Sequence, residues 1–83
     1  MAQFLFFGRF TDISKGFARD LPDGVSDSAA LSLWLCRTFE GFEAQWQRAG
    51  ARMAVNQVLV MGSAPVTIGN DDEIAFMSAL SGG

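Results

Sequence analysis

The chain has 83 residues, enough for one small domain, and a domain of this size buries only about 60 to 65% of the surface that its unfolded chain exposes. Hydrophobic residues make up 49% of it and charged residues 18%, which is typical of a compact globular protein with apolar surface left to contact a partner. The net charge of −3 argues against nucleic acid or an anionic membrane as that partner. A single cysteine, Cys36, and the lack of a leader-like or membrane-spanning apolar run predict a cytoplasmic protein.

Two strands are predicted in the first quarter of the chain. Residues 3–8 are rich in aromatics on both faces, with Phe4 and Phe6 pointing one way and Phe7 the other, as in a central strand. Residues 16–21 alternate more weakly and end at a Pro-Asp-Gly turn, which favours an edge strand. The stretch between them is predicted to be a polar connection, residues 9–15.

One long helix is predicted over residues 26–39. Ser26 is the expected N-cap, and apolar residues at a spacing of four, Leu31, Leu35 and Phe39, form one stripe that should face the core. The helix should end near residues 40–41, and a further helical turn is expected around Trp46.

Three strands should follow. Residues 52–56 and 58–60 are expected to join at Asn56-Gln57, and a last strand begins at Glu73. This order predicts an α+β domain over residues 1–77, a mixed five-stranded sheet with the helix across one face and the first and last strands parallel at its centre. Residues 78–83 are predicted to be a tail.

The tail ends in Gly82-Gly83, directly after an apolar strand. Glycines have no Cβ, so two of them can carry a terminal carboxylate into a channel too narrow for side chains. From Ser78, the tail can reach roughly 20 Å from the domain. The dipeptide alone is at least as well explained by a frayed end.

Three groups of residues carry a family resemblance over nearly the whole chain. They are residues 4–7 (FLFF), residues 54–57 (AVNQ) with 59–60, and residues 72–76 (DEIAF) with 80–83. In this order and spacing they resemble the small subunit of molybdopterin synthase, a ubiquitin-like sulfur carrier of the MoaD type. Thiamine sulfur carriers also end in Gly-Gly, but the AVNQ segment is closer to the molybdopterin branch. Ser78-Ala79 stand where the family often has two prolines, so the resemblance does not predict the path of the tail.

The resemblance implies a β-grasp fold and a function for the last residue. An E1-like adenylating enzyme would use ATP to activate the Gly83 carboxylate, and sulfur from a sulfurtransferase would convert it to a thiocarboxylate. The large subunit of the synthase, in a heterotetramer, would then use this sulfur on a cyclic pyranopterin. The catalytic groups would belong to the large subunit, and this chain would bind no cofactor or metal. The chain has no histidine and one cysteine, so a catalytic or metal site of its own is hard to assemble.

The large subunit is expected to contact three apolar side chains and the tail. The side chains are Phe7, Leu59 and Met77; in the tail, Leu80 and Ser81 should contact the partner, with Gly82 and Gly83 in its active site. Cys36 is expected to be a small apolar residue of the helix. The acidic run at 71–73 is expected to be a solvated turn, with docking onto a basic partner as the second interpretation.

Two other classes stay open. A sulfur carrier of another pathway, such as thiamine synthesis, or a protein-conjugating ubiquitin-like modifier would share the fold and tail, and conjugates to lysines would identify the modifier. A plain interaction domain with a fortuitous Gly-Gly would tolerate extension of its C-terminus.

Overall fold

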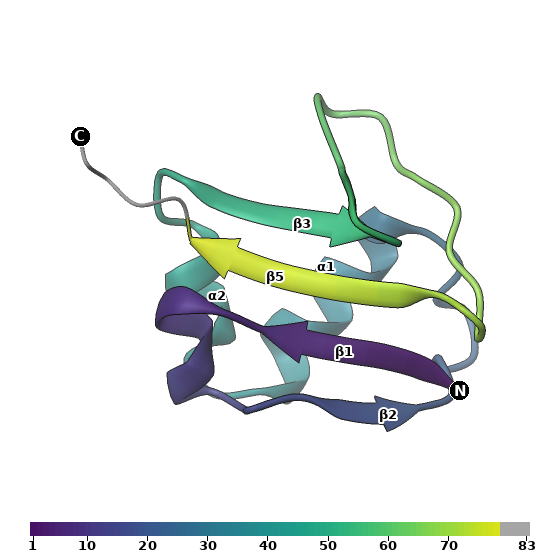
Figure 1. The fold of residues 1–83 in the computed structure, drawn as a ribbon, viewed down its shortest axis with the longest axis horizontal. Coiled ribbons are helices and arrows are strands. Elements are labelled where there is room, and N and C mark those ends of the chain that lie inside the picture. Colours follow the sequence, from purple (N-terminus) through teal and green to yellow (C-terminus); the bar gives the residue numbers. More distant parts are fainter. Residues whose placement is uncertain (79–83) are drawn as a thin grey trace.

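The computed structural model describes residues 1–78. Five strands in this part of the chain form one mixed sheet, in the spatial order β2-β1-β5-β3-β4. The helices α1 and α2 lie on one face of it (Figure 1). The elements, in chain order, are β1 (Ala2–Phe6), the 3₁₀ helix η1 (Gly8–Asp12), β2 (Phe17–Arg19), α1 (Ser28–Thr38), α2 (Phe42–Trp46), β3 (Ala51–Val55), β4 (Val58–Leu59) and β5 (Glu73–Ser78). The predicted α+β sheet with one main helix is confirmed.

The first and last strands lie side by side at the centre of the sheet. β1 and β5 are parallel, with Phe4 opposite Ile74 and Phe6 opposite Phe76, and all other pairs are antiparallel. Residues that pair across strands project from the same face, so these four side chains lie together under the helices. β2 is an edge strand, as expected, and β5 extends to Ser78, one residue past the predicted end of the domain.

The core lies between the sheet and the helices. Its fully buried large side chains come from both layers: Phe4, Phe10, Leu31, Leu35, Phe42, Ile74 and Phe76. Both Leu residues of the predicted stripe are among them, and Phe39 is partly buried against the same cluster.

Phe10 corrects the sequence prediction. It belongs to the stretch predicted to be a polar connection, yet it is 0% exposed, with its ring centroid 5.4 Å from that of Phe42 and 6.0 Å from that of Phe76. The cause is η1, which turns this one apolar side chain inward immediately after β1. The stretch has only two apolar residues, Phe10 and Ile13, and two residues are too few to establish a period, so the pattern could not predict the burial of Phe10.

The start of α1 also differs from the prediction. Asp27, and not Ser26, is the N-cap: the Ala30 N–H donates to Asp27 Oδ1 at 2.8 Å. Ser26 is held outside the helix because its carbonyl accepts the Ile68 N–H at 3.0 Å, and Asp27 forms a bridge with Thr67. At the other end, α1 stops at Thr38 because Phe39 has an extended backbone.

The β3–β4 hairpin turns at Asn56-Gln57, as predicted. Both residues have positive φ, 51° and 70°, which matches the two-residue turn that follows the natural twist of a hairpin. β4 is one residue shorter than the predicted strand, although the Val60 N–H still donates to the Met53 carbonyl of β3 at 2.8 Å.

None of the helices in residues 1–78 has the length and apolar character that crossing a membrane requires.

Candidate functional site: the open face of the sheet and the end of β5

One row of paired residues crosses the sheet on the face opposite the helices. Leu5 pairs with Ala75, Ala75 with Ala54, and Ala54 with Leu59, so the row runs from β1 to β4. All four residues are apolar. Their side chains alternate with the core residues of the same strands and therefore project away from α1 and α2.

Phe7 and Met77 extend this row into a patch. The Phe7 N–H donates to the Phe76 carbonyl at 2.8 Å, so Phe7 continues the pairing of β1 with β5. Phe7 is 49% exposed, Leu59 is 46% exposed and Met77 is partly buried. We call this surface the open apolar face: Leu5, Phe7, Ala54, Leu59, Ala75 and Met77.

The three predicted docking residues thus share one face of the sheet. Sequence reasoning missed that Ala54 and Ala75 belong to the same surface. The period-two alternation of β3 and β5 indicates that both alanines face away from the core. The alternation does not show that they neighbour Leu5 and Leu59, because that depends on the register between strands.

The end of β5 is held in place by the turn that follows β1. The Arg9 N–H donates to Ser78 Oγ at 3.2 Å, and Gly8 lies beside the same hydroxyl. Gly8 has a φ of +59°, and a Cβ there would collide with Ser78 Oγ, so this close approach requires glycine. The root of the predicted tail is therefore fixed at the same end of the sheet as Phe7. Leu80, Ser81, Gly82 and Gly83, which were predicted to act beyond this point, lie outside the described residues.

Asp72 has a structural role in the acidic turn before β5. Its carboxylate accepts hydrogen bonds from Asn56 Nδ2 at 2.9 Å and from the Gly69 N–H at 2.7 Å, which lower the pKa of this carboxyl. A carboxyl whose pKa is lowered by folding stabilises the fold above its unfolded pKa, and this contribution is lost as the pH falls through the folded value. Because the Glu73 N–H also donates to Asn56 Oδ1, the turn is tied to the β3–β4 hairpin. Docking by the acidic run stays a prediction.

Cys36 lies on α1, partly buried against the core. Burial, and secondarily the charge of Glu43, raise the pKa of its thiol. A raised pKa keeps the thiol protonated near neutral pH, where it is a poor nucleophile. This environment fits the expected structural role.

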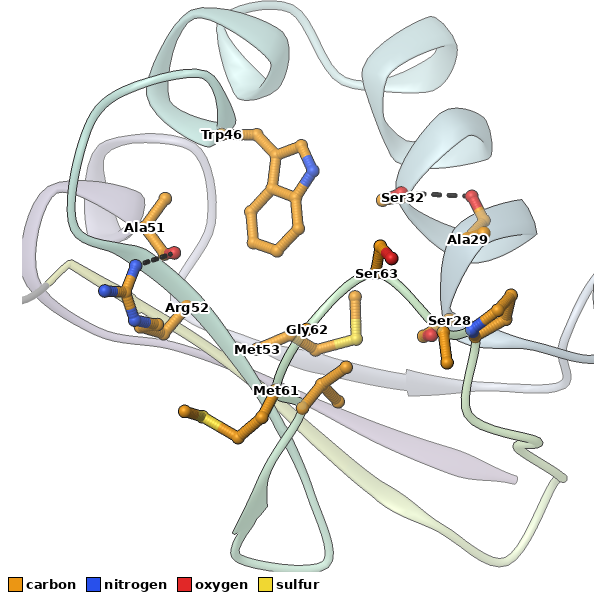
Figure 2. A pocket seen from close by; sticks show the side chains of 13 residues that line it. Ser28, Ala29, Ser32, Trp46, Ala51, Arg52, Met53, Met61, Gly62 and Ser63 are labelled. Atoms are coloured by element: carbon orange, nitrogen blue, oxygen red, sulfur yellow. Dashed lines mark hydrogen bonds between the residues drawn. The ribbon is translucent and has the colours of Figure 1, made fainter.

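A pocket of about 390 Å³ lies at the β3 edge of the fold. Trp46 of α2 and the start of β3 form one side of it, residues of α1 form the opposite side, and the 60–65 segment covers it (Figure 2). Within residues 1–78, no group of three or more His, Cys, Asp or Glu side chains could hold a metal ion there or elsewhere.

Neither the family models nor the curated proteins with which the sequence was compared match this chain.

Proposed function

We propose that the chain is the sulfur carrier subunit of a molybdopterin synthase with a β-grasp, ubiquitin-like fold. One observation carries the proposal: the central strand β5 ends at Ser78, whose hydroxyl accepts the Arg9 N–H, and the sequence Ala-Leu-Ser-Gly-Gly follows it. A rigid root and a side-chain-free tip suit a terminus that delivers its carboxylate into another protein. The strand order, the central parallel pair and the helix on one face support the β-grasp assignment.

In this proposal, the chemistry takes place at Gly83. The carboxylate attacks the α-phosphate of ATP on an E1-like partner, which releases pyrophosphate and leaves an acyl-adenylate. A sulfur nucleophile supplied by a sulfurtransferase then displaces AMP and leaves a thiocarboxylate. The large subunit transfers this sulfur to the cyclic pyranopterin. In this proposal the chain itself binds no cofactor and acts in the cytoplasm.

The open apolar face is the proposed contact with the large subunit. Phe7 and Leu59 are both nearly half exposed and belong to one apolar surface, and a contiguous exposed apolar patch is typical of a protein contact site. Arg52 pairs with Met77 and lies at the rim of this face, where a charged residue is expected around an apolar interface centre.

The test of the proposal is the intact mass of the protein isolated from its native cells. Replacing one carboxylate oxygen by sulfur adds about 16 Da, and this form should accumulate when the large subunit is absent. Methionine oxidation adds a similar mass, so fragment ions must place the addition on Gly83 and not on any of the four methionines, Met1, Met53, Met61 and Met77. A Gly83 carboxylate that stays unmodified in cells that lack the large subunit but contain the activating enzyme and a sulfur source would refute the proposal.

Replacing Phe7 by Asp should weaken binding to the large subunit by about 2 to 4 kcal/mol, because central apolar anchors carry most of the energy of an interface. The dissociation constant can be measured by titration calorimetry. The matched control is Leu33→Asp: Leu33 is 51% exposed, but it lies on α1, on the opposite side of the sheet.

Both variants should unfold at nearly the parental urea concentration, since neither residue is buried. If Leu33→Asp weakens binding as much as Phe7→Asp does, the docking surface is not the open apolar face.

A further inference from the structure

The strands in residues 1–78 contain three charged side chains, and two of them lie on the open face of the sheet. Arg19 of β2 is on the helix side, where its guanidinium carbon lies 4.9 Å from the centre of the Trp34 ring. Arg52 of β3 and Glu73 of β5 alternate with core residues of their strands and project to the other face. Figure 2 shows the Arg52 side chain directed away from Trp46. The strands therefore give the open face one positive and one negative charge.

These two charges lie on opposite sides of the apolar row. Arg52 pairs with Met77 near the end of β5, whereas Glu73 pairs with Gln3 at its beginning. Met77 is four residues beyond Glu73, which is roughly 13 Å along the strand. The apolar row crosses β5 between them, at Ala75.

Both charges are available to a partner. Arg52 is exposed and Glu73 is partly exposed, and within residues 1–78 neither forms an ion pair. Nη1 of Arg52 donates to the Ala51 carbonyl at 2.9 Å, which leaves four of the five N–H donors of the guanidinium. The separation of the two charges, roughly 13 Å, exceeds the screening length of about 8 Å in physiological salt, so they do not offset each other.

The apolar row by itself does not fix the direction in which a partner docks. A partner rotated by half a turn on the sheet would bury much the same apolar surface, and apolar burial is non-directional. Two opposite charges distinguish the two arrangements, because the rotated one brings like charges together. Sulfur transfer requires a single arrangement, since β5 ends at Ser78, on the same side of the row as Arg52.

We propose that the partner surface that covers the open apolar face is acidic opposite Arg52 and basic opposite Glu73, so that the partner docks in one orientation. This inference rests on the proposed function, which supplies the large subunit as the partner. A carboxylate of the partner accepts two N–H groups of Arg52, and a lysine or arginine of the partner pairs with Glu73. Charges at the edge of an interface act mainly on orientation and on the rate of association.

The experiment measures the rate constant for association of the chain with the large subunit by surface plasmon resonance. Arg52→Glu should lower this rate constant about tenfold in about 50 mM salt, and the difference should shrink in about 500 mM salt, which screens the charges. The matched control is Arg37→Glu. It changes the net charge by the same amount, but Arg37 is exposed on α1, on the opposite side of the sheet. The control should lower the rate constant by less than about twofold.

A second variant exchanges the two charges by combining Arg52→Glu with Glu73→Arg. The exchange keeps the composition and the net charge of −3, yet it places like charges together on both sides of the row. It should therefore associate more slowly than Arg52→Glu alone. The hydrogen bonds between Glu73 and Asn56 use only the backbone of Glu73, so the exchange leaves them in place. Urea unfolding of each variant reports that it is folded.

Association of the charge-exchanged variant at the parental rate overturns the inference, and so do equal rates for Arg52→Glu and Arg37→Glu. Intact mass of Gly83 separates this inference from the proposed function. If the parent binds the large subunit and carries a thiocarboxylate but the charge variants associate like the parent, only the inference fails. If the charge variants behave as expected but Gly83 stays a carboxylate, the sulfur-carrier function fails and the charge pattern holds. A parent chain that does not bind the large subunit overturns both.

Discussion

Deletion of Gly83 should reduce sulfur transfer to background. It shortens the tail by roughly 3.5 Å, whereas a misplacement of about 1 Å can already cost on the order of a hundredfold in rate. The reach cannot be recovered from the root, because Ser78 is held by Arg9 and by the close approach of Gly8. The measurement is the molybdopterin formed from cyclic pyranopterin by the reconstituted synthase, with the activating enzyme, ATP and a sulfur source present.

Gly82→Val tests the width of the channel. It keeps the length and the carboxylate but adds a branched side chain, so it should also lose transfer. Gly69→Val is the matched control, since a Cβ at Gly69 meets nothing within 4 Å and its φ is outside the range that favours glycine.

Near-parental product from the Gly83 deletion would show that this terminus does not carry the sulfur.

Phe10→Ala should cost about 3 to 5 kcal/mol of unfolding free energy, the usual effect of removing a fully buried aromatic ring. The whole domain is expected to have only about 5 to 15 kcal/mol, so this is a large share. The loss should be large here because Phe10 contacts Phe42, Trp46 and Phe76 at once, and collapse of the cavity would disturb all three. Urea unfolding of the parent and the variant gives the difference.

Phe7→Ala is the control for that loss. It removes the same ring three residues earlier, but from a side chain that is 49% exposed, so it should cost well under half as much. Equal losses for the two variants would mean that η1 does not place Phe10 in the core.

The elements with strong periodicity could be predicted from the sequence because both of their faces are specified locally. In β1 and β5, alternating apolar residues fixed which side chains share a face, and the parallel pairing of Phe4 with Ile74 agrees with that expectation. The turn at Asn56-Gln57 and the Leu31–Leu35 stripe could likewise be predicted from the sequence, because each depends on residues no more than four positions apart.

Other features depend on residues distant in the chain. Ser26 was predicted as the N-cap, but the N-cap is Asp27. The Ile68 N–H and Thr67 hold the backbone before the helix extended, and these contacts join residues about forty positions apart. The burial of Phe10 depends on aromatic partners from α2 and β5, which no local pattern reveals.

For the candidate site, the sequence by itself determined which side chains are apolar and that the Gly-Gly end follows a strand. Only the tertiary structure decided what surrounds them. The strand register assembled Leu5, Ala75, Ala54 and Leu59 into one row, and Gly8 and Arg9 fixed the position of Ser78. The physical reason is that alternation assigns a residue to a face of its own strand, whereas its neighbours on that face are set by hydrogen bonds between strands far apart in sequence.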